Sequence, residues 1–189
     1  MPKRVFIIHG WSGYPNECWF PWLKRELEKK GFKVEVPSMP ETNYPKIEKW
    51  VLFLAKIVGK PDKNTYFVGH SIGCQAILRY LQTIDAKVGG VVFVAGFFTL
   101  KGLETDEEKE LAKPWLETPI DTGKVKKAAR KFVAIFSDND KFVPLENERT
   151  FKEKLGAKTI VLKKMGHMGS NDNITELPMV LSELLNMTK

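Results

Sequence analysis

The residues Thr65–Leu81, TYFVGHSIGCQAILRYL, decide the fold of this chain. The apolar run Thr65–Val68 predicts a strand, and Cys74–Leu81 has the apolar spacing of a helix. Between them lies the pattern G-x-S-x-G, centred on Ser71. Glycines on either side of a serine let a strand and a helix approach without a Cβ clash, and so tight a turn pushes the hydroxyl off the backbone. The stretch therefore predicts a strand, a sharp turn that exposes the Ser71 hydroxyl, and a helix.

Short apolar runs recur along the whole chain and predict strands. They are rich in Val, Ile and Phe and mostly lack polar alternation, which is typical of strands buried on both faces of a sheet. The predicted strands are Arg4–Ile8, Lys33–Val36, Thr65–Val68, Gly89–Ala95, Lys131–Ser137 and Lys158–Leu162.

Helical patterns fill the intervals between these strands. The predicted helices are Trp19–Leu27, Pro45–Val58, Cys74–Ile84, Thr105–Lys113, Leu145–Leu155 and a last one that begins at Pro178. This alternation predicts an α/β fold with a parallel sheet, helices on both faces, and a ligand site beyond the carboxyl ends of the strands. The longest excursion, Gly96–Gly123, is too short for a large cap domain, and we expect a modest flap over the pocket.

Length and composition describe a globular protein. The chain has 189 residues, 43% of them hydrophobic and 28% charged, and we expect residues 1–189 to form a single domain. No apolar run reaches the roughly 18 residues of a membrane helix, and the short run in Met1–Gly10 predicts a strand rather than a signal peptide. Cys18 and Cys74 match no disulfide framework or metal spacing. We therefore expect a cytoplasmic protein with free thiols and no membrane partner.

The net charge of +7 raises the question of a nucleic-acid partner. The chain has one dense basic cluster, between Lys124 and Lys131. It lacks the interleaved aromatic residues that stack on bases. We interpret it as the solvated face of a helix that leads into a strand, and expect no nucleic-acid partner. The cluster consists of Lys124, Lys126, Lys127, Arg130 and Lys131.

A serine nucleophile needs a base to take its proton and a carboxylate to orient that base. In folds where the serine lies on a turn between a strand and a helix, the three residues follow one another along the chain in the order serine, acid, histidine. Of the three histidines only His167 follows both Ser71 and a later acid. Two carboxylates, Asp138 and Asp140, follow the predicted strand Lys131–Ser137, and the residues alone favour neither. The one that is not the acid is expected to form an Asx turn, in which its carboxylate accepts hydrogen bonds from local backbone amides.

A tetrahedral intermediate of acyl transfer also needs backbone N–H donors for its oxyanion. One donor is expected to be the amide of Ile72, the residue after the nucleophile. The other is expected in the loop after the first strand, where Gly10 allows the amide of Trp11 to turn inward. The alternative is that this glycine-rich loop serves only as a strand exit.

Together these motifs resemble the small α/β-hydrolase-fold serine hydrolases related to retinoblastoma-binding protein nine. The resemblance extends over essentially the whole chain, and the strings that carry it are Val5–Trp11, Trp19 after Asn16-Glu17-Cys18, Gly69–Gly73, Ser137–Pro144 and Gly166–Met168. The resemblance implies that Asp140 is the acid, that the sheet has about six strands in the order 2-1-3-4-5-6, and that no large cap domain is present. The retinoblastoma partner does not carry over, because the chain has no Leu-x-Cys-x-Glu string.

The motifs predict a serine hydrolase that cleaves a small carboxylic ester through an acyl-enzyme intermediate. Two alternatives stay open: a peptidase, aminopeptidase or amidase that uses the same groups on short substrates, and a hydrolase fold without catalysis that acts as a binding protein. No metal or other cofactor is expected. The pocket is predicted to be apolar and to include Gly10, Trp19, Phe97, Phe98, Trp115, Phe142 and Met168.

Overall fold

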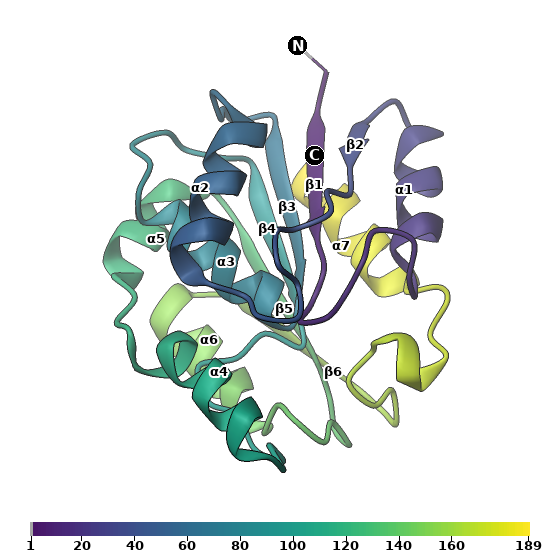
Figure 1. The fold of residues 1–189 in the computed structure, drawn as a ribbon. Helices are drawn as coiled ribbons and strands as arrows, with labels where there is room; N and C mark the ends of the chain where they lie inside the picture. The colour runs from purple at the N-terminus through teal and green to yellow at the C-terminus, as the bar shows by residue number, and fades with distance from the viewer. Residues whose placement is uncertain (1) are drawn as a thin grey trace.

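The computed structural model describes residues 2–189 and contains one parallel sheet (Figure 1). Its strands lie in the order β2-β1-β3-β4-β5-β6, which confirms the predicted α/β class and strand order. Every strand pairs in parallel with its neighbours, so all the carboxyl ends meet at one edge of the sheet. The strands are β1 (Arg4–Ile8), β2 (Lys33–Glu35), β3 (Thr65–His70), β4 (Gly90–Val94), β5 (Phe132–Ser137) and β6 (Lys158–Leu162).

Helices cover both faces of this sheet (Figure 1). On one face α1 packs against α7, while α2, α3, α5 and α6 contact one another in series on the other face. The helices are α1 (Phe20–Glu28), α2 (Ile47–Val58), α3 (Ile72–Leu81), α4 (Asp106–Glu117), α5 (Thr122–Ala128), α6 (Glu146–Leu155) and α7 (Pro178–Met187), with a short 3₁₀ helix, η1 (Ser170–Asp172). None of the helices in residues 2–189 has the length and apolarity needed to cross a membrane.

Burial of the strands differs between the centre and the edge of the sheet. The three central strands β3, β4 and β5 are buried along their whole length, as their apolar sequences predict. The expectation of burial on both faces is wrong for β2, where Lys33 and Glu35 are exposed, and for β6, where Val161 is 43% exposed. Both are edge strands of the sheet and have a neighbour on only one side.

The turn between β3 and α3 has the predicted strained form. Ser71 alone separates β3 from α3, and its backbone has φ 53° and ψ −121°, a conformation unfavourable for residues with a Cβ. A Cβ on Gly69 would lie 2.8 Å from Ile77 Cδ1 and 2.9 Å from the Cys74 amide nitrogen. A Cβ on Gly73 would collide with the carbonyl oxygen of Ile8. Both glycines are therefore required for strand and helix to approach this closely.

The long excursion between β4 and β5 forms α4 and α5. The helix α4 begins where it was predicted to begin, with a capping box between Thr105 and Glu108, but the expected end at Lys113 is wrong. The helix continues through Pro114 to Glu117, and the missing amide of the proline is tolerated because this side of the helix faces solvent. Trp115 anchors this end of α4, since its indole N–H donates to the Pro45 carbonyl at 3.0 Å.

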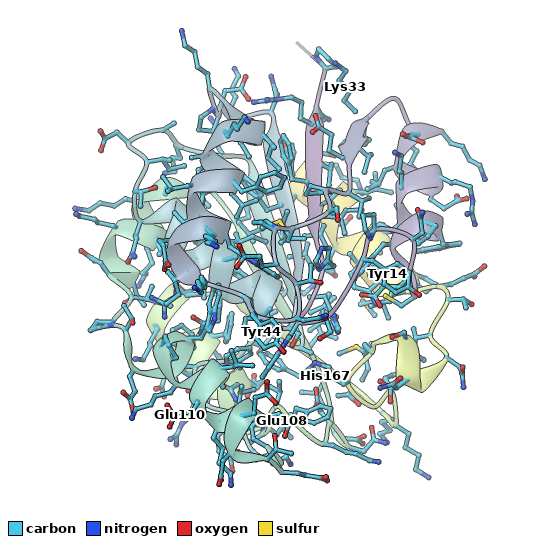
Figure 2. The ribbon with its side chains drawn as sticks, viewed as in Figure 1. Tyr14, Lys33, Tyr44, Glu108, Glu110 and His167 are labelled. Carbon is cyan, nitrogen blue, oxygen red and sulfur yellow. The ribbon has the colours of Figure 1, made fainter. Side chains whose placement is uncertain are left out.

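The basic cluster predicted to be a solvated helix face lies on and just after α5. Because these residues precede β5, they gather at the edge of the sheet opposite Ser71. In Figure 2, Tyr44, Glu108 and His167 lie toward the carboxyl ends of the strands, whereas Lys33, which begins β2, lies at the other end. The basic cluster is therefore remote from the candidate site described below.

Candidate active site

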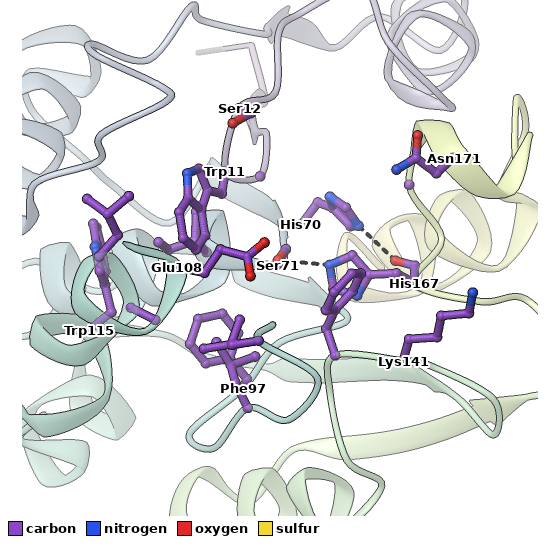
Figure 3. Close-up of a pocket in the computed structure, with 18 of the residues that line it drawn as sticks. Trp11, Ser12, His70, Ser71, Phe97, Glu108, Trp115, Lys141, His167 and Asn171 are labelled. Atoms are coloured by element: carbon purple, nitrogen blue, oxygen red, sulfur yellow. Dashed lines mark hydrogen bonds between the residues drawn. The ribbon is translucent and has the colours of Figure 1, made fainter. Parts of the chain in front are cut away.

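Three of the predicted site residues meet at the carboxyl edge of the sheet. His167 Nε2 lies 2.9 Å from Ser71 Oγ (Figure 3), and His167 Nδ1 lies 2.8 Å from Asp140 Oδ2. Ser71 follows β3, Asp140 follows β5 and His167 follows β6. With an ionised Asp140, the Nδ1–H group donates to the carboxylate and leaves Nε2 free to accept from the hydroxyl. This arrangement can take a proton from Ser71.

The Asp140 carboxylate is buried, and both of its oxygens have hydrogen-bond partners. Its Oδ1 accepts hydrogen bonds from the amides of Phe142 at 2.8 Å and Val143 at 3.0 Å, while Oδ2 faces His167. Burial acts to raise the pKa of Asp140, but the hydrogen bond and charge of His167 and the two amides outweigh it and lower the pKa below the ordinary value. Asp140 therefore remains an anion beside the imidazole.

The competing carboxylate, Asp138, is exposed and does not reach His167. Its Oδ1 instead accepts from the Lys164 amide at 2.7 Å. The neighbouring side chains act in the same way, since Ser137 Oγ accepts from the Met165 amide and Asn139 Oδ1 from the Gly166 amide. The structure therefore does not show the alternative arrangement, in which Asp138 would accept a hydrogen bond from the His167 imidazole. The expected Asx turn is wrong, because the one backbone amide that Asp138 binds lies in the loop after β6 and not in its own turn.

Two backbone amides beside Ser71 are free to bind an oxyanion. Among residues 2–189, the amides of Trp11 and Ile72 have no hydrogen-bond acceptor, whereas the Ser12 amide donates to the Thr42 carbonyl. The Trp11 indole N–H donates to the Asn43 carbonyl at 3.0 Å, which fixes the loop after β1. Both predicted donors thus keep an unused N–H, and both residues line the same cavity as Ser71.

A cavity of about 810 Å³ opens around Ser71 (Figure 3). Four residues predicted to form it do line it: Gly10, Phe97, Trp115 and Phe142. The rest of its apolar wall comes from the segment that carries α4, through Leu100, Leu103, Leu111 and Ala112. This segment acts as the modest flap expected from the sequence.

Three residues predicted to line the cavity do not line it. Trp19 and Met168 are fully buried, and the Trp19 indole N–H donates to the Met168 carbonyl at 2.9 Å. Phe98 turns away to pack on Phe151, with ring centroids 5.0 Å apart. All three lie in loops beside the site, but their side chains enter the core instead of the cavity.

The polar wall of the cavity was not predicted. It contains four carboxylates and one cation, Lys141, although the whole chain has a net charge of +7. Burial raises the pKa of Glu17. Glu108 also takes part in the capping box that begins α4. No local pattern signals Glu17 or Asp172, because they lie far apart in the chain. The four carboxylates are Glu17, Glu107, Glu108 and Asp172.

A second imidazole, His70, lies buried beside the site. Its Nε2 is 2.9 Å from the His167 carbonyl oxygen, so Nε2 carries the proton and donates. Burial and the nearby His167 lower the pKa of His70 from 6.5 to about 3. Burial likewise lowers the pKa of His9, whose Nε2 accepts from the Met39 amide. Both rings are therefore neutral in the folded protein near neutral pH.

Acid should destabilise the fold through these buried histidines. His70 binds its proton in the unfolded chain near pH 6.5 but in the folded chain only near 3, so unfolding takes up protons between those values. We expect His70 to reduce the free energy of unfolding by about 2 kcal/mol between about pH 7 and pH 5. Denaturant titrations at the two pH values measure this, and His70→Gln should show a smaller loss. An equal loss in both proteins would contradict the expectation.

Residues 2–189 bring together no group of three or more His, Cys, Asp or Glu side chains suited to a metal ion.

The chain matches one known family along nearly its whole length. The family model described as Serine hydrolase covers residues 5–186. YdeN of Bacillus subtilis (strain 168) is 31% identical over 97% of this chain and 95% of its own length. The crystal structure of the ydeN gene product matches with a TM-score of 0.90 at 29% identity over 98% of both chains. Serine hydrolase RBBP9 of Rattus norvegicus is 25% identical over 97% of this chain and 96% of its own. The resemblance inferred from the motifs is confirmed, and the chain belongs to the serine hydrolase family.

Proposed function

We propose that this serine hydrolase cleaves small carboxylic esters, with Ser71 as nucleophile, His167 as base and Asp140 as the acid. The observation that carries the proposal is the continuous set of hydrogen bonds from Ser71 Oγ through His167 to Asp140 Oδ2. Removing any link would leave either an unactivated hydroxyl or an unoriented imidazole.

In the proposed reaction, Ser71 Oγ attacks the substrate carbonyl while its proton passes to His167 Nε2. The oxyanion that forms accepts hydrogen bonds from the amides of Trp11 and Ile72, and Asp140 stabilises the imidazolium. His167 then gives the proton to the leaving alcohol, and the ester bond breaks to leave an acyl group on Ser71. Water attacks the acyl-enzyme with His167 as base, which releases the acid and restores the hydroxyl.

The cavity wall supports an apolar acyl group as the bound part of the substrate. Phe97, Leu103, Leu111 and Trp115 present apolar surface beside Ser71. The four carboxylates on the polar wall favour a second candidate, an aminopeptidase or amidase acting on substrates with a free amino group, because an ammonium group would be attracted there.

The two candidates differ in the substrates they turn over. We expect p-nitrophenyl acetate and butyrate to be cleaved with higher kcat/KM than aminoacyl p-nitroanilides, and a fluorophosphonate probe to block both activities by labelling the nucleophile. A preference for the nitroanilides would favour the aminopeptidase. A protein that cleaves neither class and does not react with the probe would contradict both candidates and indicate a binding protein.

We further propose that residues 1–189 act as one α/β-hydrolase domain, because a single sheet carries every group of the site. A cytoplasmic location is part of the proposal. The unpaired thiols Cys18 and Cys74 agree with a reducing compartment.

A further inference from the structure

The loop that carries His167 is held in an unfavourable backbone conformation. Two residues with a Cβ have positive φ there, Lys164 at 55° and Met168 at 56°, and Gly166 has φ 60°. Residues in this region of φ and ψ persist only where the surrounding structure over-determines them. The contacts of this loop therefore show what keeps the His167 imidazole in place.

One set of contacts comes from the last residue of β5 and the loop that follows it. Asp138, Asn139 and Ser137 accept from three consecutive amides of the His167 loop, at 2.7, 2.8 and 3.0 Å. These bonds fix the part of the loop that precedes His167. They do not reach the carbonyl groups of His167 and Met168.

A second set of contacts holds those two carbonyls from the opposite side. The His70 ring donates from Nε2 to the His167 carbonyl at 2.9 Å, and the Trp19 indole donates to the Met168 carbonyl at 2.9 Å. Figure 3 shows His70 reaching the backbone of His167 while the imidazole of His167 faces Ser71. His70 and Trp19 pack edge to face, with ring centroids 6.2 Å apart. Neither residue contacts the reacting hydroxyl through a hydrogen bond.

We propose that His70 and Trp19 are positioning residues, which hold the His167 and Met168 carbonyls so that the His167 imidazole stays aligned between Asp140 and Ser71. The proposal rests on the function proposed above for Ser71 and His167.

The tautomer of the neutral His70 ring supports this role. Since Nε2 must donate to a carbonyl, Nδ1 has no proton, and it is buried without a hydrogen-bond partner. An unpaired buried nitrogen costs stability, so its retention indicates that the Nε2–H donor is needed. A cationic His70 would also oppose the His167 imidazolium, because the two ring centroids are 5.0 Å apart. The neutral ring donates without that repulsion.

Substitutions that remove only the N–H donor test the proposal. His70→Leu and Trp19→Phe keep an apolar side chain but donate nothing, whereas His70→Gln restores an amide donor. Phe20→Leu is the matched control, because Phe20 packs on the His70 ring at 6.1 Å between centroids without donating a hydrogen bond. Each variant is compared with the wild type in kcat, KM, rate of fluorophosphonate labelling and thermal unfolding.

We expect His70→Leu and Trp19→Phe each to lower kcat and the labelling rate by about 10- to 100-fold with little change in KM, since small misplacements of reacting groups cost this much. His70→Gln should recover most of the rate. Phe20→Leu should lower the unfolding temperature without lowering kcat comparably. The low-field NMR signal of the His167 Nδ1 proton should shift in His70→Leu and Trp19→Phe but not in Phe20→Leu.

Two results would overturn the proposal: wild-type kcat in both donor-free variants, or equal losses in His70→Leu and His70→Gln. If His70→Leu does not fold, Trp19→Phe decides the question by the same criteria. Failure of the proposed function is recognised separately, because the wild-type protein would then show no Ser71-dependent labelling.

Discussion

Ser71→Ala is expected to lower kcat/KM for esters by about 10⁶-fold and to abolish covalent labelling by a fluorophosphonate. The alanine lacks the hydroxyl oxygen that is proposed to attack the carbonyl, while His167 and Asp140 keep their mutual hydrogen bond. The free amides of Trp11 and Ile72 remain as well, so a small residual rate over water is expected. Ester turnover and mass spectrometry of the labelled protein measure both effects.

A matched glycine variant separates the loss of the hydroxyl from a change in the fold. Alanine keeps the Cβ, so Ser71→Ala retains the strained φ of 53° and should unfold like the wild type. Ser71→Gly is equally inactive but removes that strain, and it should be more stable than Ser71→Ala by about 1 kcal/mol. Labelling that persists in either variant would refute Ser71 as the nucleophile.

Asp140→Asn is expected to lower kcat by about 10⁴-fold, because an amide that donates to His167 Nδ1 would stabilise the wrong tautomer of the imidazole. The asparagine can still accept from the Phe142 and Val143 amides through its oxygen. The fold should therefore persist, and the loss should appear in kcat rather than in KM. Steady-state kinetics with p-nitrophenyl esters measure it.

Asp138→Asn is the control for this prediction, since the two carboxylates are only two residues apart. The new side chain keeps an oxygen that can accept from the Lys164 amide, so activity within a few-fold of the wild type is expected. A larger loss in Asp138→Asn than in Asp140→Asn would reverse the assignment of the acid.

Local sterics explain why much of the fold could be predicted from the sequence. The glycines at 69 and 73 report directly on how closely β3 and α3 approach, because a Cβ at either position would collide with its surroundings. The positions of Ser71 and His167 follow from the strands that precede them, since parallel strands bring their carboxyl ends to one edge. The geometry of these parts is largely set within short stretches of chain.

The direction in which loop side chains point could not be predicted in the same way. Trp19 and Met168 lie in site loops, yet both turn into the core, where each meets the other from a distant part of the chain. Asp138 and Asp140 both follow β5, so their positions in the sequence do not distinguish them. Only the backbone conformation of their loop decides which carboxylate faces His167. In the sequence, only the family resemblance favours Asp140 over Asp138, because the chemistry of the two side chains is the same.

The cavity wall and the reacting groups are encoded in different parts of the chain. Residues 96–123 supply most of the apolar wall but none of the three proposed reacting groups, which follow β3, β5 and β6. Mutations in and around α4 can therefore change which acyl groups fit without disturbing the chemistry. Substitutions in this one segment can thus alter which molecules enter the cavity while Ser71, Asp140 and His167 stay unchanged.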